Sequence, residues 1–207
     1  MTRHRRSDRA LITLLVLALA LWLVIFVWQP ANFWLLMALG VGVLAALSLR
    51  AQPNLLGPSP SGSDVVTGLA LAAVLYGLFW LGHRLAVGIL PTAPQQIGAI
   101  YDLKAGVAPW LIAILLLAVI GPGEEIFWRG FVQRRLSGAL GEVGGWLGAS
   151  LIYAMLHAVT MNLMLVLAAL VAGLAWGYAY VRLKRLWPLI ISHAAWDVAI
   201  LLLWPIR

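Results

Sequence analysis

The sequence contains no cysteine and only seven acidic residues among 207. Without cysteine, the chain can form neither disulfide bonds nor metal sites built on thiolates. Charged residues of both signs make up 10% of the chain, whereas 63% of residues are hydrophobic and the mean hydropathy is +0.98. A soluble domain of this size could not cover so much apolar surface with so few polar side chains. The composition therefore predicts a polytopic membrane protein and excludes a soluble enzyme or binding domain.

Long apolar runs dominate the sequence, and four of them contain no charged residue. These four runs are residues 11–28, 33–49, 65–81 and 163–181. Each is about as long as a helix needs to cross the roughly 30 Å hydrocarbon layer. Three further runs, 108–120, 146–156 and 186–204, are shorter or carry polar residues, and a short span can end against neighbouring helices. We therefore predict an all-α, polytopic transmembrane helical bundle of about seven membrane helices (six to eight).

The basic residues predict a membrane orientation. If the amino terminus is cytoplasmic, the inner segments hold eleven of the fourteen basic residues and the outer segments hold three. The inner ones are Arg3, Arg5, Arg6, Arg9, Arg50, Arg129, Arg134, Arg135, Arg182, Lys184 and Arg185; the outer ones are Arg84, Lys104 and Arg207. The opposite orientation would reverse this ratio and violate the positive-inside rule. We therefore expect a cytoplasmic amino terminus, the lipid bilayer as the surrounding medium, and no nucleic-acid partner.

Polar residues divide the chain into two parts. The three amino-terminal runs contain no charged residue and no histidine, whereas every acidic or histidine residue within an apolar run lies after residue 107. We expect residues 1–107 to form a scaffold and residues 108–207 to hold the functional motifs, the two parts making one integrated domain. Residues 83–107 contain two prolines and predict an outer connection, residues 137–145 predict a glycine-rich inner turn, and Asp64 is placed to cap the third helix.

Glu124 and Glu125 follow the run 108–120 and a Gly-Pro-Gly break, which would place them at one edge of the bilayer. Acidic residues there are candidate functional groups because their desolvation is costly. If the helix continues past the break, Glu125 and Arg129 have the i, i+4 spacing of an intrahelical ion pair. Glu124 would then point about 100° away and stay free to act as a general base. The alternative is structural, because acidic residues are also favoured at the start of a helix.

Two histidines interrupt other apolar runs. His157 ends one run, with Tyr153 one turn before it, and His193 and Asp197 share one face of the last run. A buried aspartate needs a polar partner, which His193 supplies, so each group alone is compatible with a structural role. Together with the glutamates they provide a base for water, imidazoles that share protons or bind metal, and a polar group near an oxyanion. This combination suits the attack of water on an amide.

The order of these residues resembles the three motifs of the CPBP family, which comprises type II CAAX prenyl endopeptidases and bacteriocin-processing or immunity (Abi) proteins. The matching segments are Glu124-Glu125-Ile-Phe-Trp-Arg129, Tyr153-Ala-Met-Leu-His157 and His193-Ala-Ala-Trp-Asp197. The resemblance covers about residues 108–204. It implies a CAAX-protease-like core and an intramembrane (metallo)endopeptidase acting on a membrane-associated peptide or protein, in a bacterial inner membrane.

The resemblance also implies roles for each residue. Glu124 would activate water, His157 would help to hold it, and His193 with Asp197 would face the developing oxyanion. Glu125 and Arg129 would orient the first motif. Tyr153 replaces the usual Phe, and Asp197 replaces the Asn of the eukaryotic enzymes; an ionised Asp cannot donate a hydrogen bond to an oxyanion.

The cofactor prediction has two alternatives. Glu124, His157 and His193 either hold a divalent metal such as zinc or act without metal, and no organic cofactor is expected. The competing interpretations are a non-enzymatic immunity or scaffold protein that retains the family core, and a transporter with a proton relay. A transporter predicts paired broken helices related by a repeat, which this sequence lacks. The sequence makes no prediction of the substrate's identity, the oligomeric state or the need for prenylation.

Overall fold

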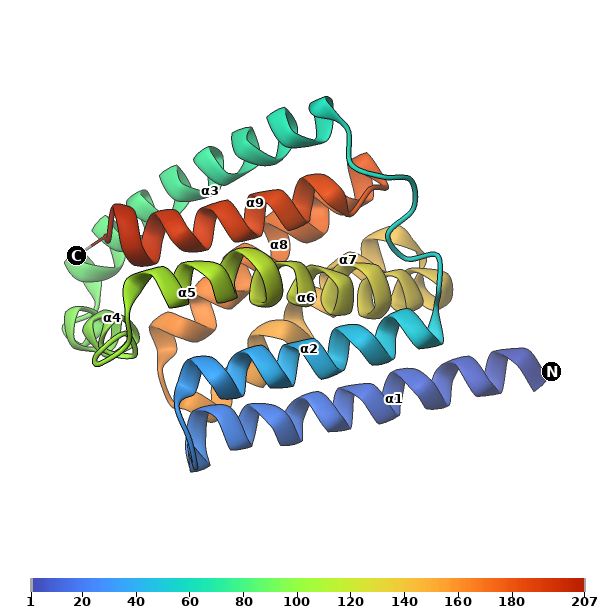
Figure 1. Ribbon diagram of the computed structural model, residues 1–207, viewed down its shortest axis with the longest axis horizontal. Coiled ribbons are helices and arrows are strands. Elements are labelled where there is room, and N and C mark those ends of the chain that lie inside the picture. Colours follow the sequence, from blue (N-terminus) through green and yellow to red (C-terminus); the bar gives the residue numbers. More distant parts are fainter. Residues whose placement is uncertain (1, 207) are drawn as a thin grey trace.

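A computed structural model describes residues 2–206 and the side chains of residues 9–206. Arg3, Arg5, Arg6 and Arg207, which the orientation argument uses, therefore lie outside the described side chains. All regular elements of the described part are helices; the long ones run roughly along one direction, whereas the short helix 93–102 lies across them (Figure 1). This confirms the predicted all-α fold.

The first half consists of three long helices and one short one. Their bounds are α1 Thr2–Trp22, extended by a π-helical segment η1 Leu23–Trp28, then α2 Phe33–Ala51, α3 Gly62–Ile89 and α4 Ala93–Asp102. The second half begins with a nearly continuous helical stretch: α5 Pro109–Leu115, η2 Leu116–Ile120, α6 Gly121–Glu125, η3 Ile126–Gln133 and α7 Arg134–His157. It ends with the 3-10 turn η4 Ala158–Thr160, α8 Leu163–Leu183, α9 Trp187–Val198 and η5 Ala199–Leu203.

Five helical stretches in the described residues are long and apolar enough to cross a membrane. One of them, Pro109–Thr160, has 52 residues, far more than the roughly 20 that one crossing needs. The chain bends within it at Gly141, whose φ of 75° is a conformation that glycine adopts readily. A sixth, shorter apolar stretch is Trp187–Leu203. The bend divides the long stretch into two legs, so the structure agrees with the predicted bundle of about seven helices in an integral membrane protein.

The ends of α3 follow from local chemistry. Ser61 is the N-cap and exchanges hydrogen bonds with Asp64, which forms a capping box; Asp64 thus assists the cap from the third helical position. At the other end, Leu90 leaves the helix because the following Pro91 disfavours helical backbone before it. The expected outer connection at 83–107 is therefore wrong in part: α3 continues through His83 to Ile89, and α4 forms most of the remainder.

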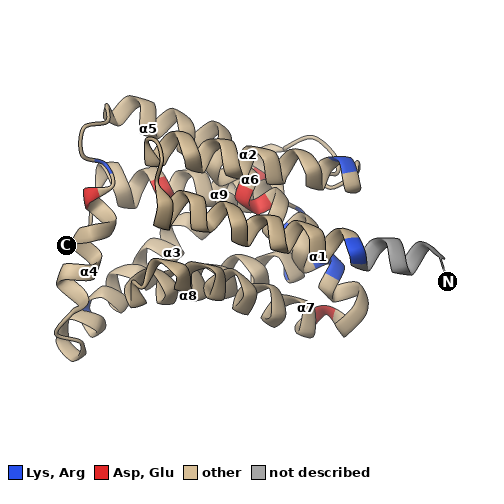
Figure 2. Cartoon of the chain, turned by 90° about the horizontal axis from the view of Figure 1, so that it is seen from below, with Lys and Arg blue, Asp and Glu red and all other residues tan. Residues whose placement is uncertain are grey.

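The predicted break at residues 121–123 is also wrong. The helix passes through Pro122, and the π-helical segments on both sides widen its turns, which helps to accommodate the proline ring. Glu124 consequently lies 15 residues from Pro109, or about 22 Å along the helix. The acidic pair in α6 therefore lies deep within the bundle and not at its edge (Figure 2).

The packing of the bundle places α6 at its centre. α1 and α2 form an antiparallel hairpin on one side, and α3 lies along α9 on the other (Figure 1). α7 lies along α8, where a Cβ atom on Gly173 would come within 3.2 Å of the Ser150 Cα atom. α6 contacts both α2 and α9, so a side chain on α6 is shielded from lipid in both directions.

Candidate active site

The seven predicted side chains come together in one buried network. They are Glu124, Glu125 and Arg129 from α6 and η3, Tyr153 and His157 from α7, and His193 and Asp197 from α9. Every one of them is at most 7% exposed. Since buried charges persist only when they are paired and hydrogen-bonded, their partners define what each can do.

Glu125 is the structural centre of the network. Its Oε1 atom accepts a hydrogen bond from Arg129 Nη1 at 2.8 Å and lies 2.7 Å from His193 Nδ1. A carboxylate only accepts hydrogen bonds, so the Nδ1 atom of His193 is the donor. The expected pair of Glu125 with Arg129 is present, whereas its bond to His193, 68 residues away, has no signal in the sequence.

Glu124 has a different environment. Its Oε2 atom accepts a hydrogen bond of 2.7 Å from the Tyr153 hydroxyl, so the side chain is not unbonded as its position on the helix suggested. In the described structure no donor reaches its other oxygen, Oε1. Glu124 thus keeps one oxygen available for water, while Tyr153 fixes the direction in which the carboxylate points.

Both ring nitrogens of His157 are engaged. Nδ1 lies 2.8 Å from the carbonyl oxygen of Tyr153, which can only accept, so Nδ1 carries a proton. Nε2 accepts a hydrogen bond of 3.4 Å from the indole Nε1 of Trp22, which is fully buried. Trp22 belongs to α1, so the amino-terminal part of the chain reaches the site directly, and the sequence did not indicate this.

His193 lies between Trp176 and the carboxylates. Its ring stacks on Trp176 with a centroid separation of 3.9 Å, and Trp176 donates to Ser192 Oγ at 2.9 Å. The Nε2 atom of His193 is 3.6 Å from Asp197 Oδ2, which is too long for a hydrogen bond but close enough for charge attraction. The predicted i, i+4 placement of the two residues on one helix face is therefore present.

The buried guanidinium of Arg129 is held by aromatic rings as well as by Glu125. It lies 5.3 Å from the ring centres of Tyr153 and Trp176, within the range of cation–π attraction. Its Nη2 atom also donates to the Ala172 carbonyl at 3.3 Å. Trp176 has no recognisable signal in a sequence with eleven tryptophans, so only the packing of α8 identifies it as part of the site.

The arrangement of the histidine and carboxylate side chains bears on the expected metal site. No group of three His, Cys, Asp or Glu side chains among the described residues is arranged to hold a metal ion. The reason is visible in the hydrogen bonds, because His157 turns toward Trp22 and His193 turns toward Glu125. Glu124, His157 and His193 are therefore not assembled as a zinc site in this arrangement, and the zinc alternative stays a prediction.

Among the described residues, three buried side-chain atoms have no hydrogen-bond partner: Glu125 Oε2, the indole Nε1 of Trp128 and the indole Nε1 of Trp196 on α9. The first two belong to the network or to a ring packed against it. The Trp128 ring lies 4.9 Å from the ring of Tyr153. Buried polar atoms without partners are rare in folded proteins, and water or a bound group commonly satisfies them. The site thus presents one acceptor and one donor to a further polar molecule.

Irregular helix geometry surrounds the site. Glu124 and Glu125 lie between η2 and η3, Trp22 directly precedes η1, and Asp197 lies two residues before η5. π-helical turns are frequent at functional positions because they redirect side chains within a helix. A Cβ atom on Gly121 would lie 2.9 Å from the Ala194 Cα atom, so only glycine allows α6 to approach α9 this closely.

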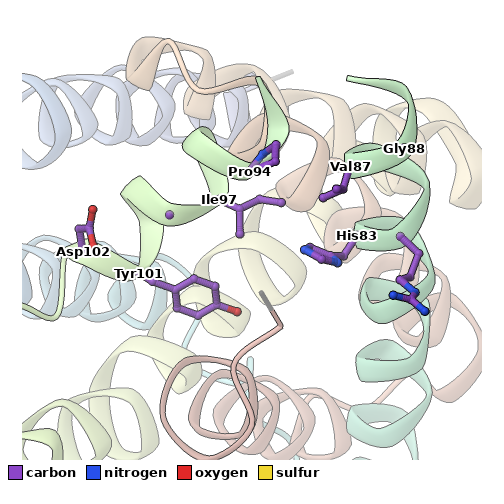
Figure 3. Close-up of a pocket in the computed structure, with 9 residues that line it drawn as sticks. His83, Val87, Gly88, Pro94, Ile97, Tyr101 and Asp102 are labelled. Carbon is purple, nitrogen blue, oxygen red and sulfur yellow. The ribbon is translucent and has the colours of Figure 1, made fainter. Parts of the chain in front are cut away.

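Two cavities lie at opposite ends of the molecule. One, of about 670 Å³, lies between α3 and α4, where His83 faces Ile97 and Tyr101 (Figure 3). The other, of about 520 Å³, lies beside the start of α7 and the end of α8. None of the seven network residues lines either cavity. The buried network is therefore separate from both of these cavities.

The comparisons with known proteins agree in part with this site. A model of the family described as "Type II CAAX prenyl endopeptidase Rce1-like" matches residues 106–199, which include all three motifs. This match confirms the resemblance inferred from the motifs, over a little under half of the chain. No solved structure matches the chain.

The curated proteins that match this chain are of a different kind, and they match it only over short segments. A protoheme IX farnesyltransferase of Methylorubrum populi is 31% identical over 96 residues, which are 43% of this chain and 30% of the relative. Protoheme IX farnesyltransferase 1 of Mesorhizobium japonicum is 35% identical over 63 residues, or 30% of this chain and 20% of the relative. The chain thus spans less than a third of the curated relatives it matches.

Proposed function

Because residues 106–199 match the model of the Rce1-like CAAX protease family, we propose that this integral membrane protein is an intramembrane endopeptidase. It hydrolyses a peptide bond of a membrane-associated protein or peptide. The observation that supports this most directly is the division of labour between the two glutamates. The Oε1 atom of Glu125 is bound by Arg129 and His193, and the side chain is completely buried, whereas Glu124 is bonded only to the neutral Tyr153 hydroxyl.

The proposed reaction begins with a water molecule bound to Glu124 Oε1. Glu124 removes a proton from this water, and the hydroxide attacks the carbonyl carbon of the peptide. The tetrahedral intermediate then loses its amine as the C–N bond breaks, and the proton held by Glu124 passes to the leaving nitrogen. The Tyr153 hydroxyl keeps Glu124 oriented throughout these steps.

His193 is proposed to stabilise the oxyanion. Its Nδ1 atom is held by Glu125, and its Nε2 atom makes no hydrogen bond to Asp197 at 3.6 Å. A protonated Nε2 can therefore donate to the developing negative charge, while Asp197 stabilises the imidazolium from the side. This assigns Asp197 a role that does not require it to donate. An ionised Asp197 in place of the Asn of the eukaryotic enzymes is therefore compatible with the proposed reaction.

We further propose that the protein lies in a bacterial inner membrane with its amino terminus in the cytoplasm. The described basic residues gather mainly at the end of the bundle where the chain begins (Figure 2). By the positive-inside rule this end faces the cytoplasm. The substrate would then enter the bilayer from that side.

A non-enzymatic immunity or scaffold role is the second candidate. It is favoured by the closure of the site, because both nitrogens of His157 are already bonded within the protein. The farnesyltransferase relatives add no third candidate, since the chain spans too little of them to carry a whole enzyme's activity.

The test compares the wild-type protein with Glu124→Ala in liposomes that contain a library of membrane-spanning peptides. We expect cleavage products from the wild type and none from Glu124→Ala. Asp102→Ala serves as the control, because Asp102 is an exposed acid on α4. Cleavage at the wild-type rate by a folded Glu124→Ala protein would overturn the proposal, and absence of any wild-type cleavage would favour the scaffold role.

A further inference from the structure

The cavity at the basic end of the bundle is separate from the catalytic network. It has a volume of about 520 Å³ and is bounded by the loop 54–58, the first turns of α7 and the end of α8. Gln133, which lines it, is nine residues beyond Glu124, or about 13 Å along the helix. What it binds is therefore a question independent of the proteolytic site.

The charged groups of this cavity are mostly cationic. Arg134, Lys184 and Arg185 line it together with a single acid, Glu142. Lys184 forms an ion pair with Glu142, and Arg185 donates to both oxygens of Asp64, at 2.8 Å and 2.6 Å. Arg134 makes no hydrogen bond or ion pair in the described structure. The cavity therefore contains one uncommitted guanidinium.

A second uncommitted donor lies in the same cavity. The hydroxyl of Tyr180 has no hydrogen bond among the described residues, although its ring is partly buried. Leu56 and Val181, both partly exposed, supply apolar surface. The cavity thus combines a cation and a hydroxyl with a surface that hydrocarbon can contact.

The wall of the cavity is held in place before any ligand binds. Arg185 bonds to Asp64 and to the Ser59 carbonyl, and the Trp187 indole donates to the Pro58 carbonyl at 2.8 Å. These bonds fasten the loop between α2 and α3 to the turn between α8 and α9. The hydrogen bonds with Asp64 also raise the pKa of Arg185, so this cation is permanent. A preformed site loses little conformational entropy on binding.

The location of the cavity indicates which class of ligand it can bind. It lies at the end of the bundle where the basic residues gather, which is where a membrane helix meets the headgroups. Basic pockets between membrane helices on this side bind anionic lipid headgroups. A guanidinium donates two parallel hydrogen bonds to a phosphate. Its charge favours a headgroup with a net negative charge over a zwitterionic one, whose own cation offsets the charge of the phosphate.

From these contacts we infer that the cavity binds the phosphate of an anionic phospholipid, with Arg134 and the Tyr180 hydroxyl as donors and Lys184 as a nearby cation. Leu56 and Val181 contact the adjoining part of the lipid. This site does not depend on proteolysis and would be present in a scaffold protein as well.

The experiment is native mass spectrometry of the purified full chain with phosphatidylglycerol, with phosphatidylcholine as the zwitterionic probe. Arg134→Gln is compared with Arg182→Gln, because Arg182 is an exposed arginine at the end of α8 that does not line the cavity. We expect Arg134→Gln to weaken phosphatidylglycerol binding about tenfold or more, since it removes a charge-assisted contact. Arg182→Gln should bind as the wild type does.

Three results would overturn the inference. Equal loss in Arg134→Gln and Arg182→Gln would show a general charge effect. Equal binding of phosphatidylcholine, whose headgroup also has a phosphate but no net charge, would show no selectivity for an anionic lipid. Displacement of the lipid by millimolar inorganic phosphate would assign the cavity to free phosphate. If Arg134→Gln fails to fold, Tyr180→Phe provides a second test because it removes only the hydroxyl. Unchanged lipid binding by Tyr180→Phe would contradict the assigned contact between this hydroxyl and the phosphate.

Discussion

At the residue scale, two adjacent glutamates have different environments although the sequence presents them as a pair. Glu125 is completely buried and bonded to Arg129 and His193, whereas Glu124 is bonded only to Tyr153. Removing one partner of a buried ion pair leaves the other charge uncompensated, which is more damaging than removing the pair together. The two residues should therefore respond differently to the same substitution.

Glu125→Gln is expected to destabilise the protein by about 3–5 kcal/mol, because Arg129 would keep its charge in a buried position without a carboxylate. Glu124→Gln should cost about 1 kcal/mol or less, since the amide oxygen can still accept from Tyr153. Thermal unfolding in one detergent, followed by circular dichroism, measures both. Equal losses of stability in the two variants would show that the glutamates share one structural role.

Trp22→Phe tests the bond that occupies His157. The substitution keeps an aromatic ring but removes the indole N–H that donates to Nε2 at 3.4 Å. If His157 contacts the attacking water through Nε2, this bond competes with catalysis. A neutral hydrogen bond contributes about 1 kcal/mol, so we expect cleavage to become about fivefold faster. A loss of activity as large as that of His157→Ala would instead make Trp22 a support for the histidine.

At the element scale, spacing predicted the contacts within a helix but not those between helices. Glu125 meets Arg129, and His193 meets Asp197, because i and i+4 share a helix face wherever the helix packs. The bonds from Tyr153 to Glu124 and from His193 to Glu125 depend on how α6, α7 and α9 pack together, which periodicity does not encode. The helix break predicted at Pro122 is absent, because flanking π-helical turns let the helix pass through the proline.

Gly121→Ala is expected to separate α6 from α9. The added Cβ atom would meet the Ala194 backbone at 2.9 Å, and overpacking of this kind costs about 1–3 kcal/mol. Cleavage should fall as well, because Ala194 adjoins His193. Gly77→Ala is the matched control, since a Cβ there has no neighbour within 4 Å. Its unfolding temperature should stay the same or rise; a similar fall in both variants would mean that helix packing at Gly121 is not the cause.

At the scale of the whole molecule, composition was sufficient to predict a helical membrane bundle, because apolar runs of sufficient length have few other stable structures. The three motifs were sufficient to indicate the family now matched by residues 106–199. The contribution of Trp22 was not predictable, since an apolar scaffold helix carries no polar pattern. The cavity near Arg134 was also not predictable from the sequence, because its walls come from three separate parts of the chain.

The proposed orientation is testable because the chain has no cysteine of its own. Ser59→Cys places a thiol in the loop between α2 and α3, and Gln95→Cys places one on α4 at the other end. In intact cells a membrane-impermeant maleimide should label Gln95→Cys and should label Ser59→Cys only after permeabilisation. The reverse pattern of labelling would place the amino terminus outside.

The central claim is that Glu124 activates water for the hydrolysis of a peptide bond. The most direct measurement is digestion of membrane-spanning peptides by the protein in liposomes prepared in ¹⁸O-labelled water, with mass spectrometry of the products. The account predicts one ¹⁸O atom in each new carboxyl group formed by the wild type, and no products from Glu124→Gln. Unlabelled new ends, or the same labelled products from a folded Glu124→Gln protein, would contradict it.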